Sequence, residues 1–182
     1  MSRTVRTLLR HAGVRAIGAV AMLAAAVNVG ADSAGPRVRS SHAYLRAMID
    51  EARQRSATFR GLVETIEGTN GIVYVEHGAC GHAVRACLAL HATMAADYRI
   101  LRVLVDARQP DWEVMASIGH ELRHALEVLG NTSLVSTQAI YLFYLGEGAT
   151  TTASGAFETR AAIAAGNAVR NEVGTYARGK LN

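Results

Sequence analysis

The chain has 182 residues, half of them hydrophobic, and a formal net charge of +4. All 15 acidic residues lie at or after Asp32, whereas four of the 19 basic residues precede it: Arg3, Arg6, Arg10 and Arg15. Residues 32–182 are therefore formally neutral, which excludes charge as a reason to expect nucleic acid or an anionic membrane as a partner. Their length and apolar content predict one ordinary globular domain.

The N-terminal arginines are followed by an apolar stretch, Ala16 to Val29, and by the small residues Gly30 and Ala31. This order is typical of a secretory signal peptide. The apolar stretch is shorter than the roughly 20 residues that span a membrane, although an uncleaved anchor is the alternative. We expect cleavage after Ala31, a periplasmic or secreted protein without stable membrane insertion, a disordered leader over 32–40 and one domain over 41–182.

Two helices are expected first. Ser40 or Ser41 can cap a helix that runs to about Arg55. Ser56 can cap the second helix, whose apolar residues recur at helical spacing: Phe59, Leu62, Val63 and Ile66.

A β section follows. Residues 72–75 are β-branched and aromatic, residues 78–81 contain turn-forming glycines, and residues 84–90 return. Residues 98–105 have the two-residue alternation of a strand and are expected to form the third strand. These strands between helices predict an α+β fold with a small, mostly antiparallel sheet.

Cys80 and Cys87 are the two cysteines of the chain. In an oxidising compartment they are expected to form a disulfide that closes the turn after the first strand. Reduced cysteines are the alternative, and a cysteine-based zinc site lacks the second pair that it needs.

Three helices are expected in the remaining chain. Asp111 can cap a helix that runs to Leu129 and ends at Gly130-Asn131. A second helix is predicted over about 133–145. After an interruption at Gly146 and Gly148, the last helix is expected over about 153–176.

The helix from Asp111 to Leu129 contains the sequence His-Glu-Leu-Arg-His at 120–124. Histidines four residues apart project from one face and can share Zn²⁺, and Glu121 between them can take a proton from metal-bound water. At about 100° per residue, the apolar residues form a stripe on the opposite side: Met115, Ile118, Leu122, Ala125, Leu126 and Leu129. The alternatives are a solvated polar face, hydrogen-bonded core histidines, and a di-iron site, which lacks a second Glu-x-x-His.

A catalytic zinc usually takes a third protein ligand and keeps one position open. Glu158 is the preferred candidate, because Phe157 beside it can anchor this segment in the core and the last helix can return across the motif helix. Glu147, on a glycine-flanked turn, is the second candidate. Glu127 is the third, although it suits a hydrogen bond to a ligand better than direct ligation.

A zinc hydrolase also needs a donor that stabilises the oxyanion. Tyr144 is preferred over Tyr141, although a tyrosine here can equally be core packing. Other possible donors lie in or near the expected hairpin: His77, His82 and His91. Arg123 points away from the histidine face and is given no catalytic role.

The motif at 120–124 with a later glutamate resembles the zincin metallopeptidases, more narrowly the gluzincin type. The chain also resembles a group of small exported bacterial proteins of unassigned activity, which share a His-Glu-Leu-x-His-Ala-x-Glu helix and a downstream Phe-Glu-Thr. The zincin resemblance implies His120 and His124 as ligands, Glu121 as general base, and a sheet whose edge strand, here Tyr98 to Val105, holds extended substrate. The chain lacks the glutamate-containing segment that is recognisable in the aminopeptidase gluzincins. It also has no downstream His-x-x-Gly-x-x-His of the metzincin kind.

The function expected from these features is that of an exported zinc-dependent peptidase acting on peptide or protein substrates. The first alternative is an inert, metal-stabilised binding or scaffold module of the cell envelope, in which Glu127 and Glu158 both bind the metal. The second is an exported α+β domain that needs no metal. The sequence favours no particular oligomeric state.

Overall fold

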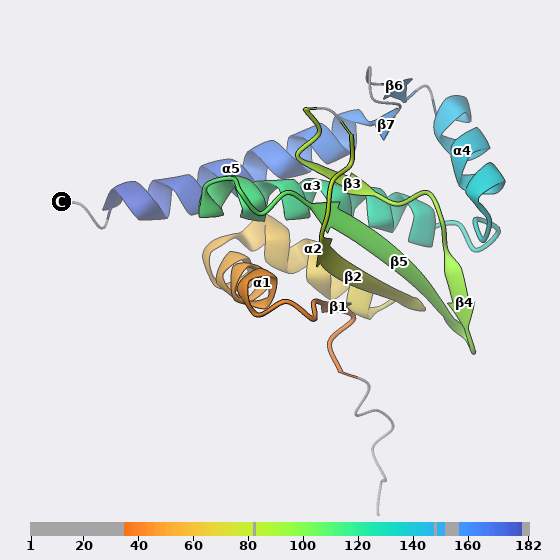
Figure 1. The fold of residues 1–182 in the computed structure, drawn as a ribbon, viewed down its shortest axis with the longest axis horizontal. Coiled ribbons are helices and arrows are strands. Elements are labelled where there is room, and N and C mark those ends of the chain that lie inside the picture. The colour runs from red at the N-terminus through yellow and green to blue at the C-terminus, as the bar shows by residue number, and fades with distance from the viewer. Residues whose placement is uncertain (1–34, 82, 148, 152–156, 180–182) are drawn as a thin grey trace, which may run out of the picture. The chain divides into compact units, whose positions relative to one another are not determined.

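The computed structural model describes residues 35–81, 83–147, 149–151 and 157–179. The expected signal peptide, its cleavage site at Ala31, His82 and Gly148 lie outside the described residues. Within the described ranges the chain forms five helices, a five-stranded mixed sheet and a separate two-stranded pair, which confirms the predicted α+β class (Figure 1).

The main sheet has the order β1-β2-β5-β3, and the short strand β4 also pairs with β5. The strands are β1 (Val38–Arg39), β2 (Gly71–His77), β3 (Ala86–Leu88), β4 (Thr93–Ala95) and β5 (Tyr98–Val105). The two long strands, β2 and β5, run parallel, and only β3 and β4 are antiparallel to β5. The prediction of a mostly antiparallel sheet is therefore wrong in its strand pairing. After the turn the chain does not return beside β2, because β5 occupies that position and pairs with β3 on its other side.

The expected disordered leader is wrong for its last residues. Val38 and Arg39 form β1, which pairs in parallel with β2, and Val38 is only 3% exposed. The Arg39 guanidinium lies over the Tyr74 ring at 4.8 Å from its centroid. The composition of this segment alone predicts no strand. The free edge of β2 orders it, because that edge offers backbone hydrogen bonds and an apolar contact.

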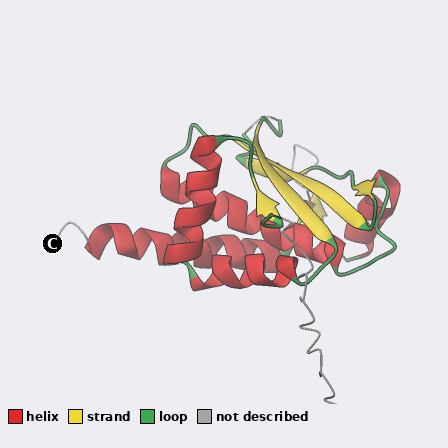
Figure 2. Cartoon of the chain, turned by 90° about the horizontal axis from the view of Figure 1, so that it is seen from below, coloured by secondary structure: helices red, strands yellow, loops and turns green. Residues whose placement is uncertain are grey.

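One face of the sheet packs against the helices and forms the core. Leu101, Val103 and Val105 on β5 are buried, whereas the residues between them are partly or fully exposed, as the alternation predicted. Most of the helical mass lies on this buried side of the twisted sheet (Figure 2).

The five helices are α1 (Ala43–Arg55), α2 (Ala57–Glu67), α3 (Asp111–Leu129), α4 (Thr137–Gly146) and α5 (Arg160–Gly179). Ser56 caps α2 as predicted, since its hydroxyl accepts a hydrogen bond from the Phe59 N–H at 2.9 Å. The N-caps of α1 and α3 are His42 and Pro110 rather than the predicted serines and Asp111. No helix in the described ranges combines the length and apolar character needed to cross a membrane.

A buried arginine connects the end of α3 to the sheet. Arg99 on β5 is 2% exposed, and its guanidinium donates to the carbonyls of Val128, Leu129 and Asn131. Carbonyls in the last turn of a helix lack the usual N–H donors four residues later, so the arginine donates to those of Val128 and Leu129 and complements the helix dipole. This contact holds α3 at a defined position on β5.

Close packing of α3 against α5 depends on two glycines. A Cβ at Gly119 would lie 2.8 Å from Val169 Cγ2, and one at Gly166 would lie 3.1 Å from the His120 Cβ. The absence of side chains therefore lets α5 run directly along the motif helix (Figure 1).

We expect Gly119→Ala to lower the free energy of unfolding by about 1–3 kcal/mol, because overpacking costs more than the gain in helix propensity. Denaturant unfolding measures this change. Gly61→Ala in α2 is the matched control, since nothing lies within 4 Å of its added Cβ; it should stabilise the protein by about 0.5–1 kcal/mol. A Gly119→Ala protein as stable as that control would contradict the close contact.

Candidate metal centre

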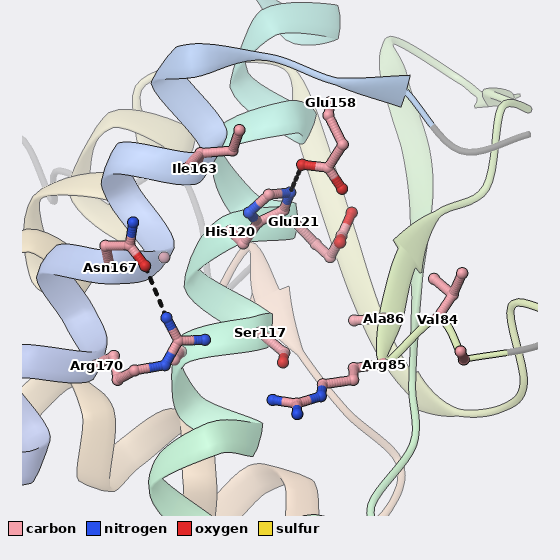
Figure 3. A pocket seen from close by; sticks show the side chains of 13 residues that line it. Val84, Arg85, Ala86, Ser117, His120, Glu121, Glu158, Ile163, Asn167 and Arg170 are labelled. Carbon is pink, nitrogen blue, oxygen red and sulfur yellow. Dashed lines mark hydrogen bonds and ion pairs between the residues drawn. The ribbon is translucent and has the colours of Figure 1, made fainter. Parts of the chain in front are cut away.

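The motif helix brings three polar side chains to one place. His120, Glu121 and His124 project from α3 toward a space bordered by α5, β3 and the short strand β7 (Phe157–Glu158), as Figure 3 shows for His120 and Glu121. The histidine face of α3 is largely covered, since Glu121 is 5% and His124 only 3% exposed. Residues of α5, β3 and β7 surround Glu121 and His124, so the alternative of a solvated polar face does not hold for these two side chains.

The structure groups two predicted histidine ligands with the preferred third ligand. Among the described residues, His120, His124 and Glu158 each offer one ligand atom, and these atoms all lie within 4.8 Å of one another. The His120 Nε2 is 3.2 Å from the Glu158 Oε2. Ligand atoms around a tetrahedral zinc lie about 3.3 Å apart, so small side-chain rotations would bring the three atoms to that spacing.

His124 carries the most specific indication of a ligand. Its Nδ1 lies 2.9 Å from the Glu127 Oε2, and since that carboxylate accepts, the proton resides on Nδ1. In the neutral tautomer with this proton on Nδ1, Nε2 is the acceptor, and this atom is buried without a hydrogen-bond partner among the described residues. A buried polar atom without a partner is costly, and a metal ion would satisfy it.

Glu127 is placed to orient the His124 ring. Its second oxygen, Oε1, accepts a hydrogen bond from the Thr159 hydroxyl at 2.8 Å. Burial alone would raise the pKa of Glu127, but the hydrogen bonds from His124 and Thr159 lower it below its usual value. An ionised Glu127 then keeps the His124 ring in the required tautomer and orientation.

The segment that carries Glu158 is anchored on both sides. Phe157 is 6% exposed and stacks on the Tyr144 ring at 5.1 Å, as expected for an anchor in the core. On the other side, the Thr159 hydroxyl accepts from the Ala162 N–H at 3.1 Å and so caps α5. The last helix thus begins at Arg160, later than predicted, and Glu158 lies in β7.

The other proposed third ligand lies elsewhere. Glu147 is the exposed C-cap residue of α4 and does not belong to the metal-ligand group found among the described residues. A glycine-flanked turn therefore exposes this carboxylate to solvent instead of directing it toward the histidines.

Glu121 lies between His120 and His124 in surroundings that raise the pKa of its carboxyl group. Burial raises its pKa most strongly, whereas the nearby His120 and His124 and a hydrogen bond from the Leu88 N–H lower it in part, which leaves the pKa above its usual value. Burial lowers the pKa of His120, but the hydrogen bond with Glu158 and the nearby carboxylates outweigh it and raise that pKa. In Glu158 the same hydrogen bond is the largest influence and lowers the pKa.

The predicted oxyanion donor, Tyr144, contacts the motif helix and the segment that carries Glu158. The Tyr144 side chain is 1% exposed, and its hydroxyl donates to the His124 backbone carbonyl at 3.2 Å. Burial raises the pKa of this phenol well above its usual value. Tyr144 therefore supports the motif helix and Phe157 in this arrangement, although it also lines the smaller cavity, and its assignment as oxyanion donor stays a prediction. Tyr141, His77 and His91 are exposed.

Two cavities meet at the candidate centre. The larger, of about 400 Å³, is lined by His120, Glu121 and Glu158 and extends along α3 and α5. The smaller, of about 180 Å³, is lined by Glu121, His124 and Glu158 together with apolar side chains. Ala86, Glu121 and Glu158 line both cavities, so the two cavities lie on either side of these residues.

The strand beside these cavities is β3, not β5. Tyr98 to Val105 was expected to be the edge strand, but β5 is interior because β2 pairs with one of its sides and β3 and β4 with the other. β3 ends the strand order and lines both cavities through Ala86. The predicted disulfide between Cys80 and Cys87 is confirmed, and it connects β3 to the loop after β2 at the wall of the smaller cavity.

Sequence reasoning missed several residues around the centre. Thr159 and the Leu88 N–H contact Glu127 and Glu121, and Arg85 and Arg170 line the larger cavity. Thr159 could have been found from the sequence, since a threonine that directly precedes a helix is a typical N-cap. Comparison of the chain with protein-family models, with curated proteins and with solved structures finds no match.

Proposed function

We propose that this protein is an exported zinc-dependent peptidase. The observation that carries the proposal is the buried, unpartnered Nε2 of His124, which lies with ligand atoms of His120 and Glu158 in one group. Two imidazoles and one carboxylate are the donor set of many catalytic zinc sites. Imidazole nitrogens disfavour Mg²⁺ and Ca²⁺, which prefer oxygen ligands.

The roles of the chain's own groups follow from their positions. A bound Zn²⁺ polarises a carbonyl and lowers the pKa of a coordinated water. Glu121 is placed to accept a proton and to deliver it to the leaving amine, since its raised pKa makes it a better base than a solvated carboxylate. An extended peptide would lie along β3 across both cavities, with its cleaved bond next to Glu121.

The inert scaffold is the weaker alternative. It needs Glu127 as an additional ligand, but the Glu127 carboxylate accepts hydrogen bonds from His124 and Thr159 instead. The cavity of about 400 Å³ beside His120 also offers room for a substrate. For export, the Cys80–Cys87 disulfide is supporting evidence, because such bonds persist in oxidising compartments.

Peptide hydrolysis by the mature protein tests this proposal. We expect a peptide library to be cleaved, the cleavage to stop with a chelator and to return with Zn²⁺. Glu158→Ala should lose both bound zinc and activity, whereas Glu147→Ala, at an exposed carboxylate, should keep both. Stoichiometric zinc without hydrolysis would support the scaffold instead, and protein purified without zinc would contradict both.

A further inference from the structure

The larger cavity has two arginines that the proposed reaction does not use. Arg85 comes from the segment before β3 and Arg170 from α5, and both line the cavity. Figure 3 shows their guanidinium groups approaching from opposite walls, at the end of the cavity away from Glu158, with Ser117 nearby on α3. The cavity thus joins a candidate metal centre at one end to a pair of cations at the other.

These arginines are held in place by one carboxylate. Glu113 is 8% exposed, and its Oε2 lies 2.9 Å from the Arg170 Nη2 and 3.1 Å from the Arg85 Nη1. The Arg170 Nη1 also donates to the Asn167 side chain at 2.7 Å. Two guanidinium groups share one carboxylate, so the cluster of Arg85, Glu113 and Arg170 keeps a net positive charge.

The cluster has donors left for a ligand. A guanidinium carries five N–H donors, and the partners of Arg85 and Arg170 among the described residues use only part of them. The side chain of Arg85 is 60% exposed, so its remaining donors are accessible from solvent. Planar guanidinium groups with free donors bind carboxylates in particular, often through two parallel hydrogen bonds.

The position of Glu113 on α3 sets the distance between the arginine cluster and the peptide bond that would be cleaved beside Glu121. Ser117 and Glu113 lie one and two turns before Glu121, or about 6 Å and 12 Å along the axis. An extended peptide covers about 3.3–3.6 Å per residue. A carboxylate bound by the arginines would therefore lie about two or three residues from the peptide bond beside Glu121.

We infer that Arg85 and Arg170 form a subsite for a substrate carboxylate in the larger cavity, so that the protein selects peptides with a negative charge two or three residues from the cleaved bond. The carboxylate is either the C-terminus of the peptide or an Asp or Glu side chain, since both present the same group. The inference rests on the proposed function for the peptide nature of the ligand, but the arginine cluster itself needs no metal.

Binding of small peptides to the as-purified Glu121→Gln protein tests the subsite without cleavage. The probes are N-acetyl-trialanine as free acid, the same peptide as C-terminal amide, and N-acetyl-Ala-Glu-Ala amide, titrated into ¹⁵N-labelled protein by NMR. At least one carboxylate probe should bind about tenfold more tightly than the neutral amide, because charge-assisted hydrogen bonds are lost in the amide. The two carboxylate probes distinguish a C-terminal from a side-chain preference.

Arg85→Gln, added to the same protein, should remove that preference, while Arg170 still pairs with Glu113 and preserves the fold. The matched control is Arg102→Gln, since Arg102 is 58% exposed, also pairs with a carboxylate, and lies outside the residues that line the cavity. Equal binding of acid and amide, no binding of any probe, or an unchanged preference in Arg85→Gln would each overturn the subsite. If the purified protein contained no zinc but still preferred the carboxylate probes in an Arg85-dependent way, the result would contradict the proposed function and support the subsite.

Discussion

Glu121→Gln should lower peptide turnover by about 10²–10⁴-fold, because an amide cannot accept the proton that a general base takes. Glutamine has nearly the same shape, and its side-chain oxygen can still accept the hydrogen bond from the Leu88 N–H that contacts this position. The ligand atoms belong to His120, His124 and Glu158, so zinc content should stay at the wild-type level. Turnover and elemental analysis on the same preparation measure both effects.

The control for this substitution is Glu147→Gln, which changes an exposed carboxylate at the end of α4. It should leave turnover and zinc content unchanged. Full activity in Glu121→Gln would refute the proposed role of Glu121 as base. Loss of zinc together with activity would instead assign Glu121 to metal binding, which the present geometry does not predict.

Removal of the metal should lower the melting temperature of the wild-type protein by roughly 10 °C. A ligand at a thousandfold its dissociation constant stabilises the folded state by about 4 kcal/mol, and each kcal/mol shifts a domain of this size by roughly 2–4 °C. The physical reason is the buried Nε2 of His124, which has no partner among the described residues and gains one when the metal binds. Thermal unfolding with and without a chelator measures the shift.

His124→Ala should melt at one temperature regardless of chelator, because a principal ligand is lost. His91→Ala, which truncates an exposed histidine away from the ligand group, should keep the full response to the chelator. A chelator effect of equal size in His124→Ala would place the stabilising metal elsewhere. An unchanged melting temperature in the wild type would favour the domain that needs no metal.

Local sequence patterns predicted the parts of the site that lie on one helix. The bounds of α3 and the common face of His120 and His124 follow from helical periodicity and from Gly130 at the helix end. The Ser56 cap depends on one hydroxyl and a backbone N–H three residues away. The disulfide was predicted from the presence of two cysteines in a chain that we expect to be exported.

Features made by distant segments were predicted less well. The parallel pairing of β2 with β5 and the interior position of β5 were missed, because a strand pattern states which residues face the core but not which strand lies alongside. Tyr144 was identified as a possible donor, yet only packing shows that its hydroxyl donates to the His124 carbonyl. Glu158 was preferred from Phe157 beside it, but two other glutamates remained open.

The amino-acid sequence by itself determined the paired histidines, the intervening carboxylate and the helix that carries them, because helical geometry relates residues one turn apart wherever the helix lies. Tertiary structure alone decided that Glu158 approaches them, that Glu127 orients His124, and that β3 borders the cavities. These contacts join elements far apart in the chain, and their geometry depends on how the glycine-lined faces of α3 and α5 and the edge of the sheet pack together.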